Sequence, residues 1–244
     1  MEKNTLTDLL RSWPHKPGQI NARTVECPDG RVVLQVRVEL GILQMETNGR
    51  PDGARPEGRE TVFELARSRI AEETESARLQ ASTCAALRDE AALFSYRSVV
   101  FSVLDDHAGV LRDTERNLLV VEFTLVNAEH SDDRSRASST LPQLLMMRSR
   151  ARSTLAVRAG QPKLARTVLD EGLVELEAAY RERGGRPAFE ASQEARVLMG
   201  MRELLVPQLP ASQRQELRDR LKDALAVENF ELAAILRNEL RLME

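Results

Sequence analysis

SQRQELRDRLKDALAVENFELAAILRNELRLME, residues Ser212–Glu244, predicts two short amphipathic helices folded back on each other. Ser212 and Gln215 have the spacing of a capping box, so the first helix is expected to begin near Gln213. Apolar residues then recur three and four positions apart, which places them on one helical face. They are Leu217, Leu221, Ala224 and Leu225.

The second helix of this stretch is expected to begin at Asn229, a favourable N-cap residue. One stripe of that helix holds Phe230, Ala233, Ala234, Arg237 and Leu240. A connection of only a few residues makes the two helices antiparallel. Two helices of four turns or fewer bury too little apolar surface to be stable alone. The hairpin is therefore expected to pack on the rest of the chain or on another hairpin.

The order of residues in this hairpin resembles the UVR motif, the helical hairpin found at the end of UvrB and inside UvrC. The resemblance is carried by Glu228, Phe230, Glu231, Ala233, Ala234, Leu236, Arg237, Glu239 and Leu240. Asn238 departs from it, because the family usually has Asp there. The segments Leu40–Glu46 and Gly49–Gly53 also look like those of bacterial proteins that carry a UVR motif. An ordinary C-terminal hairpin with an alanine-rich seam is the alternative.

The resemblance implies a protein–protein contact made by the hairpin. Its partner would be a second copy or another UVR-bearing protein, in excision repair or in the regulation of a protease–chaperone system. The residues expected to make the contact are Leu221, Leu225, Phe230, Ala233, Ala234, Arg237 and Leu240.

The composition indicates a chain that buries a core and favours helices. Its 244 residues are 42% hydrophobic but only 4% aromatic, enough for one large domain or two small ones. A net charge of -3, from 35 basic and 38 acidic residues, argues against a general nucleic-acid binder, and no sequence-specific nucleic acid is expected as a partner. Cys27 and Cys84 form neither a zinc pattern nor a disulfide framework, which suggests a reducing cytoplasm. No apolar run approaches the ~20 residues that span a bilayer, and Met1–Thr5 lacks the apolar stretch expected of a secretory signal.

Residues 1–60 contain the only clear strand pattern. Arg23–Cys27 precedes the turn sequence Pro28–Gly30, and Arg31–Leu40 alternates apolar and polar residues. The expected apolar face holds Val32, Leu34, Val36, Val38 and Leu40. The sequence thus predicts a small β-hairpin, with Gly41 at a bulge or bend before Ile42–Met45.

After a Gly/Pro-rich loop at Thr47–Gly58, the chain is predicted to be helical from Thr61 to its end. The expected helices are 61–80, 82–105, 110–128, 141–159, 162–183 and 188–206, besides a short one at 5–13 and the terminal pair. The fold class is therefore mainly α, with packed helical hairpins. We expect an N-terminal segment at 1–60, a helical domain at 61–206 and the UVR motif at 207–244.

One pair of helices has a partly tetratricopeptide-like character. Its small and apolar positions are Ser153, Ala156, Gly160, Ala165, Leu169 and Gly172. Generic helix packing explains the same pattern, since the large aromatic residues of that repeat are missing from the first helix.

Four arginines are candidates for contacts with an anion or a partner. Arg50 and Arg55 lie in the Gly/Pro-rich loop, and Arg148 and Arg152 share a helical face four residues apart. Internal ion pairs or a solvated face are the alternative for all four. The run Arg112–Asn117 is likewise expected to be a solvated face or an ion-pair network between helices.

Catalysis and cofactor binding have no signature in the sequence. No nucleophile motif, dinucleotide fingerprint or paired-carboxylate motif is recognisable, so no catalytic residue, cofactor or metal is expected. His15, His107 and His130 are isolated from other ligand residues.

The sequence therefore favours a non-enzymatic, cytoplasmic adaptor whose hairpin docks on another protein, with no membrane contact. The alternative is a helical-repeat module that binds a peptide or small ligand, with the hairpin as a structural cap. An unrecognised enzyme is a third reading, which a deep polar pocket would support.

Overall fold

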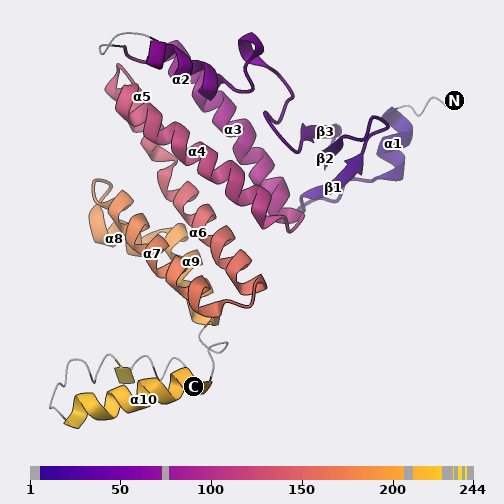
Figure 1. Cartoon of the computed structure of the whole chain (residues 1–244). Helices are drawn as coiled ribbons and strands as arrows, with labels where there is room; N and C mark the ends of the chain where they lie inside the picture. The colour runs from indigo at the N-terminus through magenta and orange to yellow at the C-terminus, as the bar shows by residue number, and fades with distance from the viewer. Residues whose placement is uncertain are drawn as a thin grey trace. The chain divides into compact units, whose positions relative to one another are not determined.

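The computed structural model describes residues 6–72, 77–205 and 211–226, together with Ala233, Leu236, Arg237 and Leu240. A small antiparallel sheet near the N-terminus is followed by a succession of helices, which confirms the predicted mainly α fold (Figure 1). The chain divides into two compact units, residues 1–144 and 145–244. None of the helices in these described ranges is both long and apolar enough to cross a membrane.

The first unit begins with a helix and a sheet and continues as helices. Its elements are α1 (Leu6–Ser12), β1 (Asn21–Glu26), β2 (Val32–Val38), β3 (Gly41–Glu46), the 3-10 turn η1 (Pro56–Gly58), α2 (Val62–Glu72), α3 (Ala81–Val103), α4 (His107–Asn127) and α5 (Ser131–Ser139). The second unit begins within α6. Its elements are α6 (Leu141–Arg158), α7 (Pro162–Tyr180), α8 (Gly185–Ala191), α9 (Gln193–Leu205) and α10 (Ala211–Ala226).

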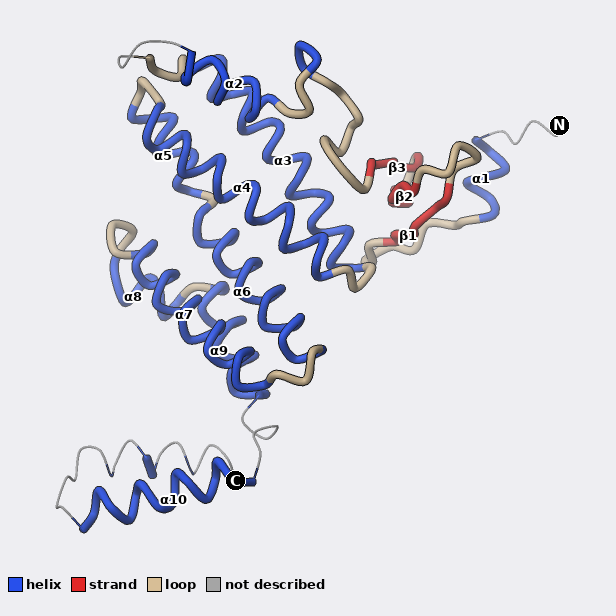
Figure 2. The backbone as a smooth tube through the Cα atoms, in the orientation of Figure 1, coloured by secondary structure: helices blue, strands red, loops and turns tan. Residues whose placement is uncertain are grey.

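The sheet has three strands where the sequence predicted a hairpin of two. The expected hairpin is present, since β1 pairs antiparallel with β2 across the turn at Pro28–Gly30. A tight turn at Glu39 and Leu40 then returns the chain as β3, which pairs with the other edge of β2 (Figure 2). This third strand was missed because its turn contains neither Gly nor Asn, the residues that mark a two-residue hairpin loop.

The predicted apolar face of β2 is only partly correct. Leu34 and Val36 are buried, but Leu40 is 92% exposed because it lies in the turn rather than in the strand. Val33 points to the opposite face and is also buried, so both faces of this central strand are covered in part.

Several predicted helix limits are wrong. The helix expected at 61–80 ends at Glu72, and Leu79 instead makes an isolated parallel bridge to Ala128. Helix α5 begins at Ser131, where a break was expected, and α4 begins at His107 because Asp106 accepts a hydrogen bond from the Gly109 amide at 2.9 Å. The helix expected at 188–206 is two helices, α8 and α9, separated at Ser192.

The core of the first unit forms where α2, α3 and α4 meet. Its buried apolar residues are Phe63, Ala66, Leu79, Cys84, Leu87, Val120 and Ala128. Phe63 also packs edge-on against Phe123, with ring centroids 5.5 Å apart. In Figure 1 the long helices α3 and α4 run side by side, and they form the platform for the loop that follows β3.

The second unit contains the helical hairpin predicted from small residues. Gly160, at φ +70°, ends α6 and lets the chain reverse into α7. Ser153, Ala156, Ala165 and Leu169 are buried as expected. The closest approach is at Gly172, where an added Cβ would lie 2.2 Å from the Ser149 Oγ. Small side chains at this crossing therefore set how closely the two helices pack.

We predict that Gly172→Ala destabilises the protein although alanine is the better helix former. The added methyl overlaps Ser149, and overpacking of this kind typically costs about 1–3 kcal/mol. Gly200→Ala in α9 is the matched control, because nothing lies within 4 Å of the Cβ it would add. The control is expected to gain up to about 1 kcal/mol from helix propensity. Urea denaturation of the two variants measures the difference, and equal stabilities would contradict the close crossing.

Candidate interaction sites

The terminal hairpin has a small apolar core of its own. Ala224 of α10 is buried together with Ala233 and Leu236, and Leu217 and Leu221 pack against them in part. Only 2% of Ala233 is exposed. The alanine-rich seam thus joins α10 to the segment that follows it, and Ala233 is used within the hairpin.

The other predicted contact residues of the hairpin lie in different surroundings. Leu225 is 42% exposed, Arg237 is exposed and Leu240 is half-buried. Phe230 and Ala234 fall outside the described residues. Of the described positions, Leu225 therefore offers a partner the largest free apolar side chain.

The first unit contains a buried charged network that the sequence did not reveal. Glu90 on α3 is fully buried, and its carboxylate accepts hydrogen bonds from the backbone amides of Val62 at 2.6 Å and Phe63 at 3.2 Å. It also pairs with Arg50 at 3.2 Å and with Arg116 of α4. One carboxylate thus caps the start of α2 and ties it to the loop and to two helices.

A second buried pair anchors the segment after β3. Arg97 of α3, only 1% exposed, binds Asp113 of α4 through two hydrogen bonds of 2.7 and 2.8 Å. Its remaining amino group donates to the carbonyl oxygens of Glu46 at 2.8 Å and Gly49 at 2.9 Å. The planar guanidinium thus joins a loop to two helices in one plane, a geometry that lysine does not offer.

The environment shifts the pKa values of groups in this network. Burial lowers the pKa of Arg116, although the neighbouring Glu90 opposes that effect. Partial burial acts to raise the pKa of Asp52, but its hydrogen bonds with Arg50 and with the Ala54 amide outweigh burial and lower that pKa overall. Asp52 is therefore held ionised, and it fixes the turn that follows Arg50.

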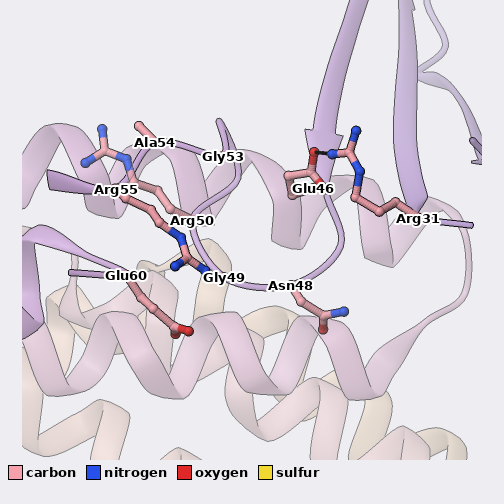
Figure 3. A pocket seen from close by; sticks show the side chains of 9 residues that line it. All are labelled: Arg31, Glu46, Asn48, Gly49, Arg50, Gly53, Ala54, Arg55 and Glu60. Atoms are coloured by element: carbon pink, nitrogen blue, oxygen red, sulfur yellow. Dashed lines mark hydrogen bonds and ion pairs between the residues drawn. The ribbon is translucent and has the colours of Figure 1, made fainter. Parts of the chain in front are cut away.

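The loop between β3 and α2 lines an open cavity of about 330 Å³, to which Arg50 of this network also contributes. Figure 3 shows the ion pair of Arg31 and Glu46 at one end, and Arg50, Arg55 and Glu60 at the other. Arg31 also contacts Asp29 at 2.7 Å, and Arg50 contacts Asp52 at 2.8 Å. The cavity is therefore lined by charges of both signs, most of them already balanced.

The four arginines predicted as candidate contacts lie in different surroundings. Arg50 makes the internal ion pairs that were the alternative to anion binding, whereas Arg55 is exposed and lines the cavity. On α6, Arg148 pairs with Glu175 of α7, and Arg152 is exposed. In the run at 112–117, Asp113 and Arg116 take part in an ion-pair network between α3 and α4, and Asp113, Thr114 and Asn117 are buried.

A signal for the buried network is present in the sequence. Leu87, Glu90, Phe94, Arg97 and Phe101 recur three and four residues apart, so two charged residues stand on the apolar stripe of α3. Charged residues are almost never fully buried unless they are paired. Their partners come from a loop and from α4, and single-sequence spacing does not identify such contacts.

The cysteines are both free thiols, and burial raises the pKa of the Cys84 thiol. Within the described ranges, no three His, Cys, Asp or Glu side chains gather in an arrangement that would hold a metal ion. His107 contacts Asp105 at 3.1 Å, and His15 approaches Glu39 at 4.0 Å.

A scan against protein-family models, a search of curated proteins and a search of solved structures each found no match to this chain.

We predict that Glu90→Gln strongly destabilises the first unit. The amide keeps the shape of the side chain but removes the charge that balances Arg50 and Arg116. Breaking a buried ion pair in this way typically costs about 3–5 kcal/mol. Glu190→Gln is the control, because Glu190 pairs with Arg186 at 2.8 Å on an exposed helix face, where such pairs contribute about 0–1 kcal/mol. Thermal and urea denaturation compare the two, and a similar small loss in both would contradict the buried network.

Proposed function

We propose that this protein is a non-enzymatic adaptor whose terminal hairpin docks on another helical hairpin. The partner is a second copy or another UVR-bearing protein. The observation that carries the proposal is Leu225 of α10, an apolar side chain that is 42% exposed beside the buried Ala224. The described buried residues of the hairpin are Ala224, Ala233 and Leu236.

An exposed apolar side chain on this seam supports association because burial of apolar surface stabilises packed helices. Each Å² of apolar surface removed from water contributes about 25 cal/mol, so covering Leu225 would add to the stability of the hairpin. A second hairpin would cover Leu225 and extend the apolar seam. Four-helix arrangements of short hairpins gain their stability in this way.

The cellular setting of the proposal rests on the sequence. The resemblance to the UVR motif points to excision repair or to the regulation of a protease–chaperone system. Two unpaired cysteines favour the cytoplasm. The non-enzymatic role rests on the lack of a catalytic motif in the sequence, and the balanced charge argues against sequence-specific nucleic-acid binding.

Leu225→Glu is the variant that tests the docking proposal. It places a charge on the free apolar position, and loss of a central interface contact typically costs 2 kcal/mol or more, about thirtyfold in Kd. Sedimentation equilibrium of the full chain, alone and mixed with purified UvrB, measures both kinds of association. We expect the wild-type chain to associate with itself or with UvrB, and the variant to lose that association while its circular dichroism is unchanged.

Leu164→Glu provides the matched control, because Leu164 is a similarly exposed leucine on α7, outside the hairpin. It is expected to associate like the wild type. If the wild-type chain associates with neither partner, or if both variants behave alike, the docking proposal is wrong. If Leu225→Glu unfolds the whole chain, the hairpin is a structural cap.

A further inference from the structure

A second cavity lies next to the one in Figure 3, and the two share a wall. The first has a volume of about 330 Å³ and the second about 350 Å³, and Asn48 lines both. Both belong to the first unit, on the side of the loop that follows β3. A ligand that occupies both cavities therefore lies against Asn48.

The two cavities differ in chemistry. The second has an apolar floor made by Leu34, Phe101 and Leu104, with Arg112 and Asp106 at its polar edge. Such a mixture suits one large apolar side chain that enters from a polar surface. The first cavity is lined by charged groups and suits a polar or ionised group instead.

Arg55 is the group of the first cavity that is free to bind an anion. Arg31 and Arg50 are both engaged in ion pairs, whereas no hydrogen bond or ion pair joins the Arg55 side chain to any described residue. A guanidinium in a concave site forms paired hydrogen bonds with a carboxylate. Glu60 lines the same end of the cavity, and its carboxylate repels a multiply charged anion but accepts hydrogen bonds from N–H groups. This pair of groups favours a peptide with an acidic side chain over a phosphate.

Asn48 is suited to bind the peptide backbone between the two cavities. Its side chain is exposed, and its hydrogen bonds are long: the amide nitrogen donates to the Thr47 hydroxyl at 3.5 Å, and the amide oxygen accepts from Arg112 at 3.4 Å. A side-chain amide offers both a donor and an acceptor, which matches the N–H and C=O groups of one peptide unit.

The loop that carries these groups is held in place before any ligand arrives. Arg97 binds the carbonyl oxygens of Glu46 and Gly49 on either side of Asn48, and Arg50 is tied to the buried Glu90. A site fixed in this way loses little entropy when it binds.

From these observations we propose that the first unit binds a short acidic peptide segment across Asn48. An apolar side chain of the peptide enters the cavity floored by Phe101, and a nearby Asp or Glu side chain pairs with Arg55. This site is separate from the terminal hairpin and does not depend on its docking function.

The test uses the full chain and an array of acetylated, amidated octapeptides. Each peptide carries one Leu, Ile, Phe or Met and one or two Glu residues at every relative spacing, and matched peptides carry Lys in place of Glu or Ser in place of the apolar residue. We expect binding that requires both the apolar and the acidic residue. The best peptide, labelled with fluorescein, is then titrated by fluorescence anisotropy.

Arg55→Glu and Arg59→Glu form the decisive pair of variants. Both residues are exposed on the same loop, but only Arg55 lines a cavity. We expect at least about a tenfold loss of affinity for Arg55→Glu, as when a charge-assisted hydrogen bond is lost, and little change for Arg59→Glu. Val32→Ser, at the second cavity, should also weaken binding, whereas Leu43→Ser, at a similarly exposed sheet position outside both cavities, should not.

Three results would overturn the proposal. The first is an array that shows no preference for peptides with both an apolar and an acidic residue. The second is an equal loss of affinity in Arg55→Glu and Arg59→Glu. The third is that inorganic phosphate displaces the labelled peptide as effectively as the unlabelled peptide does. Circular dichroism of each variant confirms that the fold is retained, since the side chains changed are exposed.

Discussion

The first unit depends on five charged side chains that meet between α3, α4 and the loop after β3. Glu90 and Asp113 supply the negative charges, and Arg50, Arg97 and Arg116 surround them. Removing such groups from water costs several kcal/mol for each ion, so they are stable only when every partner is present. Because each charged group needs all of its partners, the loop, the start of α2 and the two long helices must adopt their folded positions together.

The buried network also explains how a loop rich in Gly and Pro can have a fixed conformation. Residues 47–61 have little apolar side chain to bury, and a loop of this composition is expected to gain little from packing. Arg97 holds its beginning through two carbonyl oxygens, and Glu90 holds its end through the amides of Val62 and Phe63. Asn48, which lines both cavities, lies between the two carbonyl groups that Arg97 binds.

The sequence predicted what depends on local periodicity and missed what depends on distant pairing. The helical class of the chain, the first β-hairpin and the small-residue crossing of α6 and α7 follow from spacing alone, whereas α5 and the break between α8 and α9 do not. The third strand was missed because Glu39 and Leu40 carry no turn signal. Glu90 and Arg97 were missed as site-forming residues because their partners are 16 to 51 positions away. Among the candidate arginines, spacing did not distinguish Arg50, which is paired internally, from Arg55, which is free to bind.

The two proposed sites give an adaptor two independent contacts. The hairpin offers Leu225 to another hairpin, while the first unit offers a charged and an apolar cavity to an extended peptide. Two weak contacts on one chain raise the effective concentration of each partner for the other. This arrangement suits a protein that brings two others together, whichever process it serves.

The most direct test of the network is amide hydrogen exchange at the start of α2. The first amides of a helix have no acceptor within the helix and normally exchange quickly. Because the Val62 and Phe63 amides donate to the buried Glu90, we expect them to be protected nearly as well as the core of α3. The Lys163 and Leu164 amides of α7 serve as the comparison, since Gln161 provides no side-chain cap there, and they should exchange fast. Equally fast exchange at Val62 and Phe63 would contradict a buried carboxylate that fixes the loop.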